Sequence, residues 1–137
     1  MSLVSIRAAL EVGLNGLTPA LVTAYENVAF TPPAKDTPYQ RVVMLPARPE
    51  NPAVGAQHRR EVGVMQVSLH YPFNAGTQPA MWRAELIQAR FRRGSTWTNA
   101  GATVIVDLTP AISPGRIQDD RFVIDVSVPY YADIFTT

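Results

Sequence analysis

The stretch Glu61-Val-Gly-Val-Met-Gln-Val-Ser-Leu-His-Tyr71 decides the fold, because apolar and polar residues alternate along it. Successive side chains of an extended chain point to opposite faces. One face would carry Met65, Val67, Leu69 and Tyr71, and the wetter or contacting face would carry Gln66, Ser68 and His70 together with Glu61. The pattern predicts a long β-strand over residues 61–71 with one face on a core.

Four further segments have the composition of β-strands. The first ends at Thr31-Pro32-Pro33, where prolines cannot continue a ladder. The last alternates apolar and polar side chains up to Tyr130. These segments are residues 24–30, 39–46, 102–108 and 121–130.

The N-terminal segment has helical spacing. Its apolar residues from Leu3 to Leu17 recur every three or four positions, which places them on one stripe of a helix. Asn15-Gly16 supplies a stop, because glycine tolerates the left-handed conformation that ends many helices. We expect an amphipathic helix of about three turns.

A second helix is predicted from Gln78 to about Arg93. Thr77 can cap its start, and Gly94 follows its end. The last turn would contain three arginines, whose charges complement the helix dipole. They are Arg90, Arg92 and Arg93.

Together these elements predict one α+β domain over residues 1–137, in the order α-β-β-β-α-β-β. Consecutive strands without intervening helices indicate a mainly antiparallel sheet of four to five strands, with two helices packed on one face. Two connections, residues 47–60 and 109–120, are long and rich in proline and glycine. A long loop of this kind either reaches a neighbouring subunit or has no role.

The composition points to a protein that covers part of its surface by association. Hydrophobic residues make up 47% of the 137 residues, but charged residues only 17%, against about 25% in typical domains. Lys35 is the only lysine among twelve basic residues. Arginine suits interfaces better than lysine does, although a GC-rich coding sequence would give the same bias. Self-association is the simplest expectation.

Charge and cysteine content exclude several classes of protein. A net charge of +1 gives no general attraction to DNA or to an anionic membrane. The lack of cysteine excludes disulfides, thiolate metal sites and cysteine nucleophiles. The sequence also has no signal peptide and no run of about 18 apolar residues, so we expect synthesis and folding in the cytoplasm.

No constellation of residues forms a recognisable active site, and we predict no catalytic residue, cofactor or metal. The common nucleotide-binding, hydrolase and zinc motifs are missing from the sequence, and His58 and His70 lie too far apart in the pattern to form a metal site. Two alternatives stay open. A hydrolase would need Glu26, Asp107 or Asp125 to converge, and a ligand or nucleic-acid binding module would use Trp97, His70 or Tyr131.

Four segments, taken together, resemble the tail terminator (tail completion) proteins of long-tailed bacteriophages and prophages. The second of them contains Glu26, Asn27, Phe30 and Pro32, which match the family's Glu-Asn-x-x-Phe-x-Pro pattern. The four segments are Ile6-Arg-Ala-Ala-Leu-Glu11, Tyr25-Glu-Asn-Val-Ala-Phe-Thr-Pro32, Pro38-Tyr-Gln-Arg-Val-Val-Met-Leu-Pro46 and Gly55 followed by Arg60-Glu-Val-Gly-Val-Met-Gln-Val-Ser-Leu-His-Tyr-Pro72.

The resemblance implies a structural protein of the virion tail, made in the host bacterial cytoplasm. Such proteins assemble as a ring, typically a homohexamer, that caps the head-proximal end of the tail tube. The ring ends tube polymerisation, offers a surface to head-completion or connector proteins, and lets DNA pass without specific binding. The expected partners are therefore other copies of the chain, the tail tube protein and the head-completion proteins. Candidate interface residues in the two long loops are Arg48, Arg59, Arg60 and Arg116.

Overall fold

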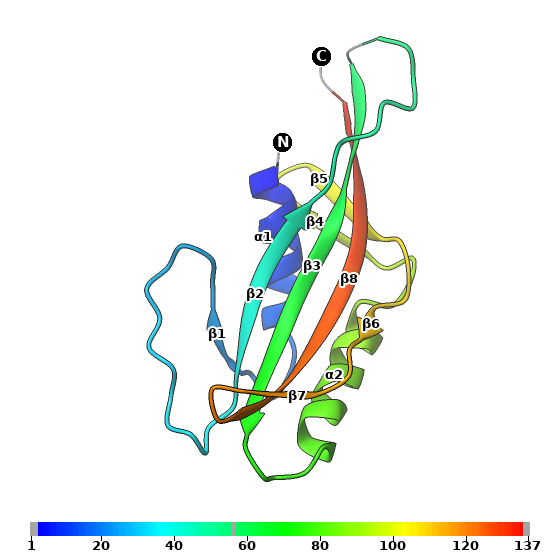
Figure 1. The fold of residues 1–137 in the computed structure, drawn as a ribbon. Helices are drawn as coiled ribbons and strands as arrows, with labels where there is room; N and C mark the ends of the chain where they lie inside the picture. Colours follow the sequence, from blue (N-terminus) through cyan, green and yellow to red (C-terminus); the bar gives the residue numbers. More distant parts are fainter. Residues whose placement is uncertain (1–2, 56, 136–137) are drawn as a thin grey trace.

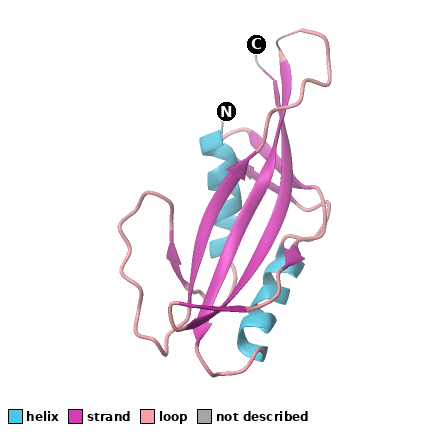
Figure 2. Ribbon diagram, viewed as in Figure 1, coloured by secondary structure: helices cyan, strands magenta, loops and turns pink. Residues whose placement is uncertain are grey.

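The computed structural model describes residues 3–55 and 57–135. Within these ranges the chain forms an α+β fold of two helices and eight strands (Figures 1 and 2). The elements, in chain order, are α1 (Leu3–Asn15), β1 (Val22–Ala24), β2 (Tyr39–Pro46), β3 (His58–Pro72), α2 (Gln78–Arg90), β4 (Thr96–Asn99), β5 (Ala102–Val106), β6 (Ala111–Ile112), β7 (Arg116–Gln118) and β8 (Arg121–Phe135).

The strands form one mixed, curled sheet in the order β1-β2-β3-β8-β5-β4, with β6 and β7 also paired to β8. Its centre is the antiparallel pair of β3 and β8, each 15 residues long and paired from end to end. All other pairs between neighbouring strands are antiparallel except that of β1 with β2. The long central pair therefore provides the strands with which β2, β5, β6 and β7 pair.

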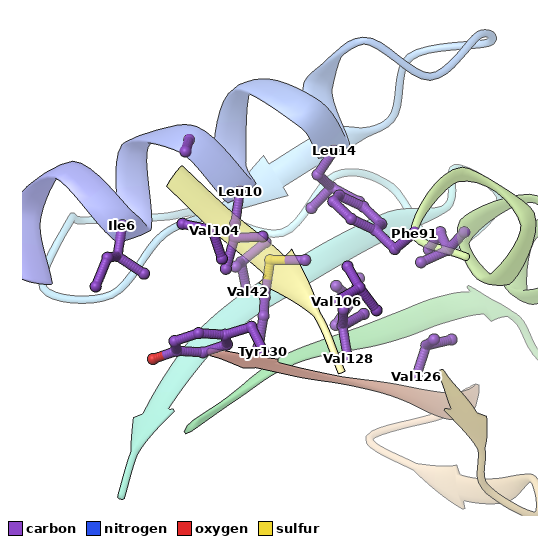
Figure 3. Close-up of a cluster of buried hydrophobic side chains, with 14 of the residues drawn as sticks. Ile6, Leu10, Leu14, Val42, Phe91, Val104, Val106, Val126, Val128 and Tyr130 are labelled. Carbon is purple, nitrogen blue, oxygen red and sulfur yellow. The ribbon is translucent and has the colours of Figure 1, made fainter. Parts of the chain in front are cut away.

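Both helices cover the same face of the sheet, which lies behind the central strands in Figure 1. That face holds the core, where Met65, Val67 and Leu69 of β3 are fully buried. Figure 3 shows α1 placing Ile6, Leu10 and Leu14 against residues of β5 and β8. Each such side chain, when fully buried, contributes about 1.5–3 kcal/mol to folding. The alternation along β3 thus selects the face that the helices cover.

The sequence predicted the main elements well. The bounds of β2 are as predicted, α1 ends at Asn15 as expected, and β3 and β8 are longer than expected. β3 begins at His58 because Glu50 pairs with Arg60 through two backbone hydrogen bonds, so the ladder continues into the connection before it.

The expected sheet of four to five antiparallel strands is wrong in strand number and order. β4 is a short strand that returns into β5 through Ala100 and Gly101, both with positive φ. β6 and β7 are two and three residues long and lie within the connection expected to be a loop. β1 covers Val22–Ala24 and not residues 24–30, because Asn27 adopts a φ of 56° that breaks the extended chain.

α2 starts at Gln78 as predicted, but its end and its cap differ from the expectation. It ends at Arg90, so Arg92 and Arg93 lie beyond its last turn, and only Arg90 sits at the negative end of the dipole. Thr77 occupies the cap position but makes no capping hydrogen bond through its side chain. The start of the helix is instead compatible with a proline in the first turn, where the lost N–H has no helical acceptor.

Candidate assembly surfaces

The end of the β3–β8 pair where His58 meets Phe135, which we call the upper end, carries a cluster of charged and aromatic side chains on the face opposite the helices. Arg60 donates from Nε and Nη2 to the two oxygens of Asp133, at 3.0 and 3.1 Å. The same guanidinium lies 4.5 Å from the ring centre of Tyr131. His58 contacts Asp133 at 3.0 Å and stacks on Phe135. The hydrogen bonds from Arg60 lower the pKa of Asp133, so this carboxylate stays ionised near neutral pH.

The connection from β2 to β3 projects beside this cluster, next to the C-terminal end of β8 (Figure 1). Arg48 is exposed on it, and so is Val54. Arg59 bonds Glu61 at 2.8 Å. Glu61 is itself buried, because its odd position places it on the same face as Met65. The expectation that Glu61 lies on the wetter face is therefore wrong.

Arg116 lies far from the other three candidate arginines. It donates from Nη1 to Asp125 Oδ2 at 2.6 Å, and Ser68 donates to the other oxygen of Asp125. Burial would raise the pKa of Asp125, but these bonds lower it below the usual value. Asp125 and Asp133 are eight residues apart on β8, which is about 26 Å along a strand. The structure thus places the candidate arginines at two separate positions.

Between these two ion pairs the open face of the central strands is largely apolar. Residues of β2, β3 and β8 share this face by their pairing register, and no helix covers it (Figure 1). They are half-buried or exposed: Val43, Leu45, Val62, Val64, Pro129 and Tyr131. Such a face suits a contact with another protein surface.

Glu26 closes part of the free edge of the sheet. It lies in a turn, accepts the backbone N–H of Met44 at 2.8 Å and pairs with Arg7 of α1. The bond from Met44, followed by that from Arg7, lowers the pKa of Glu26. Pro46, next along the same edge, has no N–H to offer. A carboxylate and a proline therefore restrict strand addition where β1 stops covering β2.

The lower end of the open face is buried under the connection between β1 and β2. His70 stacks on Tyr39 with 4.5 Å between the ring centres, and the guanidinium of Arg121 lies over the Tyr39 ring, 4.8 Å from its centre. Arg121 also donates to three carbonyls of the connection, those of Pro33, Ala34 and Thr37. Burial, and then the nearby Arg41 and Arg121, lower the pKa of His70 to about 4. His70 is thus a buried, neutral residue and not the wet one expected.

The residues considered for a binding module do not converge. Trp97 lines a pocket at the ends of the helices, whereas His70 is stacked on Tyr39 and Tyr131 lies under Arg60.

The three carboxylates considered for a hydrolase also have separate surroundings. Glu26 is held by Arg7 and Asp125 by Arg116, and Asp107 is exposed after β5. Over residues 3–55 and 57–135 no group of three or more histidines and acids could hold a metal ion.

The molecule is thus a small α+β domain whose most developed features are a long central strand pair, an open sheet face and paired surface charges. A family model described as "Phage tail terminator protein" matches residues 5–130. The chain belongs to the phage tail terminator protein family.

A solved structure is similar to this chain in fold. It has a TM-score of 0.80 and 29% sequence identity, and the match covers 100% of this chain and 99% of the other. No curated protein matches the sequence. In the part of the chain that the structure describes, neither helix is long and apolar enough to cross a membrane.

Proposed function

We propose that the protein forms a ring that caps the head-proximal end of the phage tail tube, where it ends tube polymerisation and offers the head-attachment surface. The observation that carries this proposal is membership of the tail terminator family over residues 5–130, which makes the chain a component of a phage tail. The ring contains several copies of one chain, with a hexamer as the expected number. We assign it no catalytic step and no cofactor.

The surfaces of the fold support a role in assembly. The open sheet face is apolar between two arginine–carboxylate pairs, and only 17% of the residues are charged. A ring of identical copies needs two different surfaces on each copy, since each contact is heterologous. The upper-end arginines, Arg48, Arg59 and Arg60, and the distant Arg116 are candidates for contacts with the tube protein or the head-completion proteins.

The charge of the chain is compatible with passage of DNA through the ring. At +1 per copy, six copies carry about +6 in total. Each phosphate that a channel neutralises adds to its affinity for DNA, and a channel that binds many phosphates would retain the genome. A nearly neutral ring lets DNA slide without specific binding.

The test is polymerisation of the tail tube protein of the same phage in the presence of the purified chain. We expect tubes that stop growing and carry the chain at one end only. Tubes that grow equally long with and without the chain, or chain bound along the whole tube, would contradict the proposal.

A further inference from the structure

A pocket opens where the C-terminal ends of α1 and α2 meet β4. Its volume is about 580 Å³, and Leu17, Leu86, Ala89 and Trp97 supply its apolar lining. Trp82 is 54% exposed and lies one turn before Leu86 on the same side of α2. An apolar stripe on α2 therefore runs out of the pocket onto the surface, and no element in the described part of the chain covers Trp82.

Two arginines, Arg90 and Arg92, line this pocket, which we call the Trp97 pocket, and Arg93 comes next in the chain. Arg90 lies over the Trp97 ring at 5.0 Å and donates to the carbonyl of Gly13. Arg92 lines the pocket, and Arg93 follows it. Both are exposed, and in the described residues none of the three arginines makes an ion pair. The pocket thus combines an apolar patch around Trp97 with two lining arginines, and a third arginine follows them in the chain. Within residues 3–55 and 57–135 none of the three has a carboxylate partner.

The loops next to the N-terminal end of α2 form a second surface, which is acidic where the Trp97 pocket is basic. Phe73 and Ile117 project from it, and each is 58% exposed. Phe73 shares one hollow with Asp36 and Asp120 and a second with Ile117. We call this surface the Phe73 tip, and it comprises Lys35, Asp36, Phe73, Ile117, Asp119 and Asp120. Lys35 offsets one of the three aspartate charges, which leaves a net charge of −2.

The two surfaces cannot meet within one molecule. α2 has 13 residues and separates them, since the Phe73 tip lies before its start and the Trp97 pocket lies at its end (Figure 1). A helix of that length spans about 20 Å. Any contact between the tip and the pocket must therefore involve two copies of the chain. Such a contact is heterologous and generates a ring when the rotation closes.

We propose that the Phe73 tip of one copy docks in the Trp97 pocket of the next, and that this contact joins consecutive subunits of the ring. The inference rests on the proposed function, since it names the surfaces through which the ring forms. Phe73 and Ile117 would fill the apolar groove, while the aspartates would face Arg90, Arg92 and Arg93. Aromatic side chains and arginines at the centre of a pocket are the usual source of binding energy in protein interfaces.

A charge exchange between two variants tests this contact. The first variant, Arg92→Glu with Arg93→Glu, changes the charge of the three pocket arginines from +3 to −1. The second, Asp36→Lys with Asp119→Asn and Asp120→Asn, changes the charge of the tip from −2 to +2. Asparagine is chosen at 119 and 120 because both have positive φ, which asparagine tolerates. Arg90 is left in place because it bonds α1.

Assembly is measured by sedimentation velocity at low salt, on tail tubes if the free chain does not assemble, with thermal unfolding as the check on folding. Each variant alone brings like charges together, so its half-assembly concentration should rise at least about tenfold. An equimolar mixture should assemble like the wild type, because the reversed pocket of one variant matches the reversed tip of the other. One chain carrying both sets of changes should also assemble.

A second, uncharged pair of variants addresses the apolar part of the contact. Phe73→Ala should weaken self-assembly, whereas Phe135→Ala, at a phenylalanine that is 62% exposed at the far end of the sheet, should not. Equal effects of the two substitutions would overturn the proposed contact.

The outcomes separate this inference from the proposed function. If both charge variants assemble like the wild type, another surface joins the copies and the inference is wrong, although the ring stands. If both fail and their mixture also fails, the arginines serve a different partner, such as the tube protein or a nucleic acid, and the inference is again wrong. If the wild type forms no ring, alone or on tubes, both proposals fail.

Discussion

Gly63 in the middle of β3 offers a sharp test of how the central strands pack. It pairs with Pro46 of β2 and with Tyr130 of β8. A Cβ atom added there would lie 2.6 Å from the Tyr130 hydroxyl and 2.8 Å from the backbone oxygen of Leu45. Tyr130 is buried, and the Leu45 oxygen belongs to a paired strand, so neither can move away freely.

We therefore expect Gly63→Ala to destabilise the protein by about 1–3 kcal/mol, the usual cost of overpacking a core. For a domain of this size, that loss corresponds to a fall in Tm of about 4 to 10 °C. The assay is thermal and urea unfolding followed by circular dichroism. In a Tyr130→Phe background the cost should be smaller, because the nearest clashing atom is gone, although the contacts with the Cζ atom of the ring and with the Leu45 oxygen remain.

Whether Gly63→Ala lowers or raises the stability shows whether the space over Gly63 is filled. Glycine in an open strand position costs roughly 0.5–1 kcal/mol relative to alanine. If Gly63→Ala raises the stability by such an amount, the ring of Tyr130 does not occupy the space over Gly63, and the account of the central strands is wrong.

Three further predictions concern stability and local order. Glu26→Gln should lower the free energy of unfolding by about 0.5–1 kcal/mol at pH 7, measured by urea unfolding, a value kept small by solvent exposure. Because the pKa of Glu26 is lowered in the folded state, its contribution to stability is present above the unfolded pKa and should fade as the pH falls through the folded pKa. A stability difference between the two proteins that persists at pH 2 would refute this. His70 has a folded pKa of about 4, so as the pH falls the unfolded state binds a proton before the folded state does, and the wild type should lose up to about 3 kcal/mol of stability between pH 6.5 and 4. His70→Phe keeps the stack on Tyr39 and should remove that loss. Identical dependence of stability on pH in the two proteins would disprove it. Arg121→Met removes three bonds to carbonyls of the β1–β2 connection, so a lysine-specific protease should cleave faster at Lys35, the only lysine. Arg93→Met, at an exposed arginine beyond α2, should not change the rate.

The sequence revealed the elements whose pattern is long and regular. Alternation over β3 and β8 and the helical spacing of α1 each involve many residues that face one core, so burial alone determines them. The sequence pattern does not predict the short strands, because a strand of two to four residues has no measurable period. β6, β7 and β4 owe their existence to the neighbouring long strand, and not to their own composition.

Other features depended on contacts between distant parts of the chain. Tyr25 to Phe30 has β-type composition, but the turn at Asn27 brings Glu26 onto the N–H of Met44, eighteen residues away. Arg92 and Arg93 were explained as partners of the helix dipole, yet α2 ends before them. The position of Arg92 beside Trp97 depends on how the two helices end against β4, and no local sequence pattern contains that information.

The sequence pattern also does not predict which polar residues are buried. His70 falls on the open face by its position, and Tyr39 of β2 together with the connection held by Arg121 covers it. Arg83 is almost fully buried within α2 and donates to the carbonyl of Pro19. The spacing that places Arg83 between Ala80 and Ala84 gives no sign of that acceptor, because the acceptor belongs to a distant loop.

The proposed function requires this protein to assemble with copies of itself into a closed ring. Electron microscopy of the purified chain, alone and added to tail tubes, shows whether such a ring forms. We expect annular particles, of about 90 kDa for six copies of 15.0 kDa, either free or seated on one tube end. Single 15.0 kDa chains under both conditions, even at high protein concentration, would contradict the account.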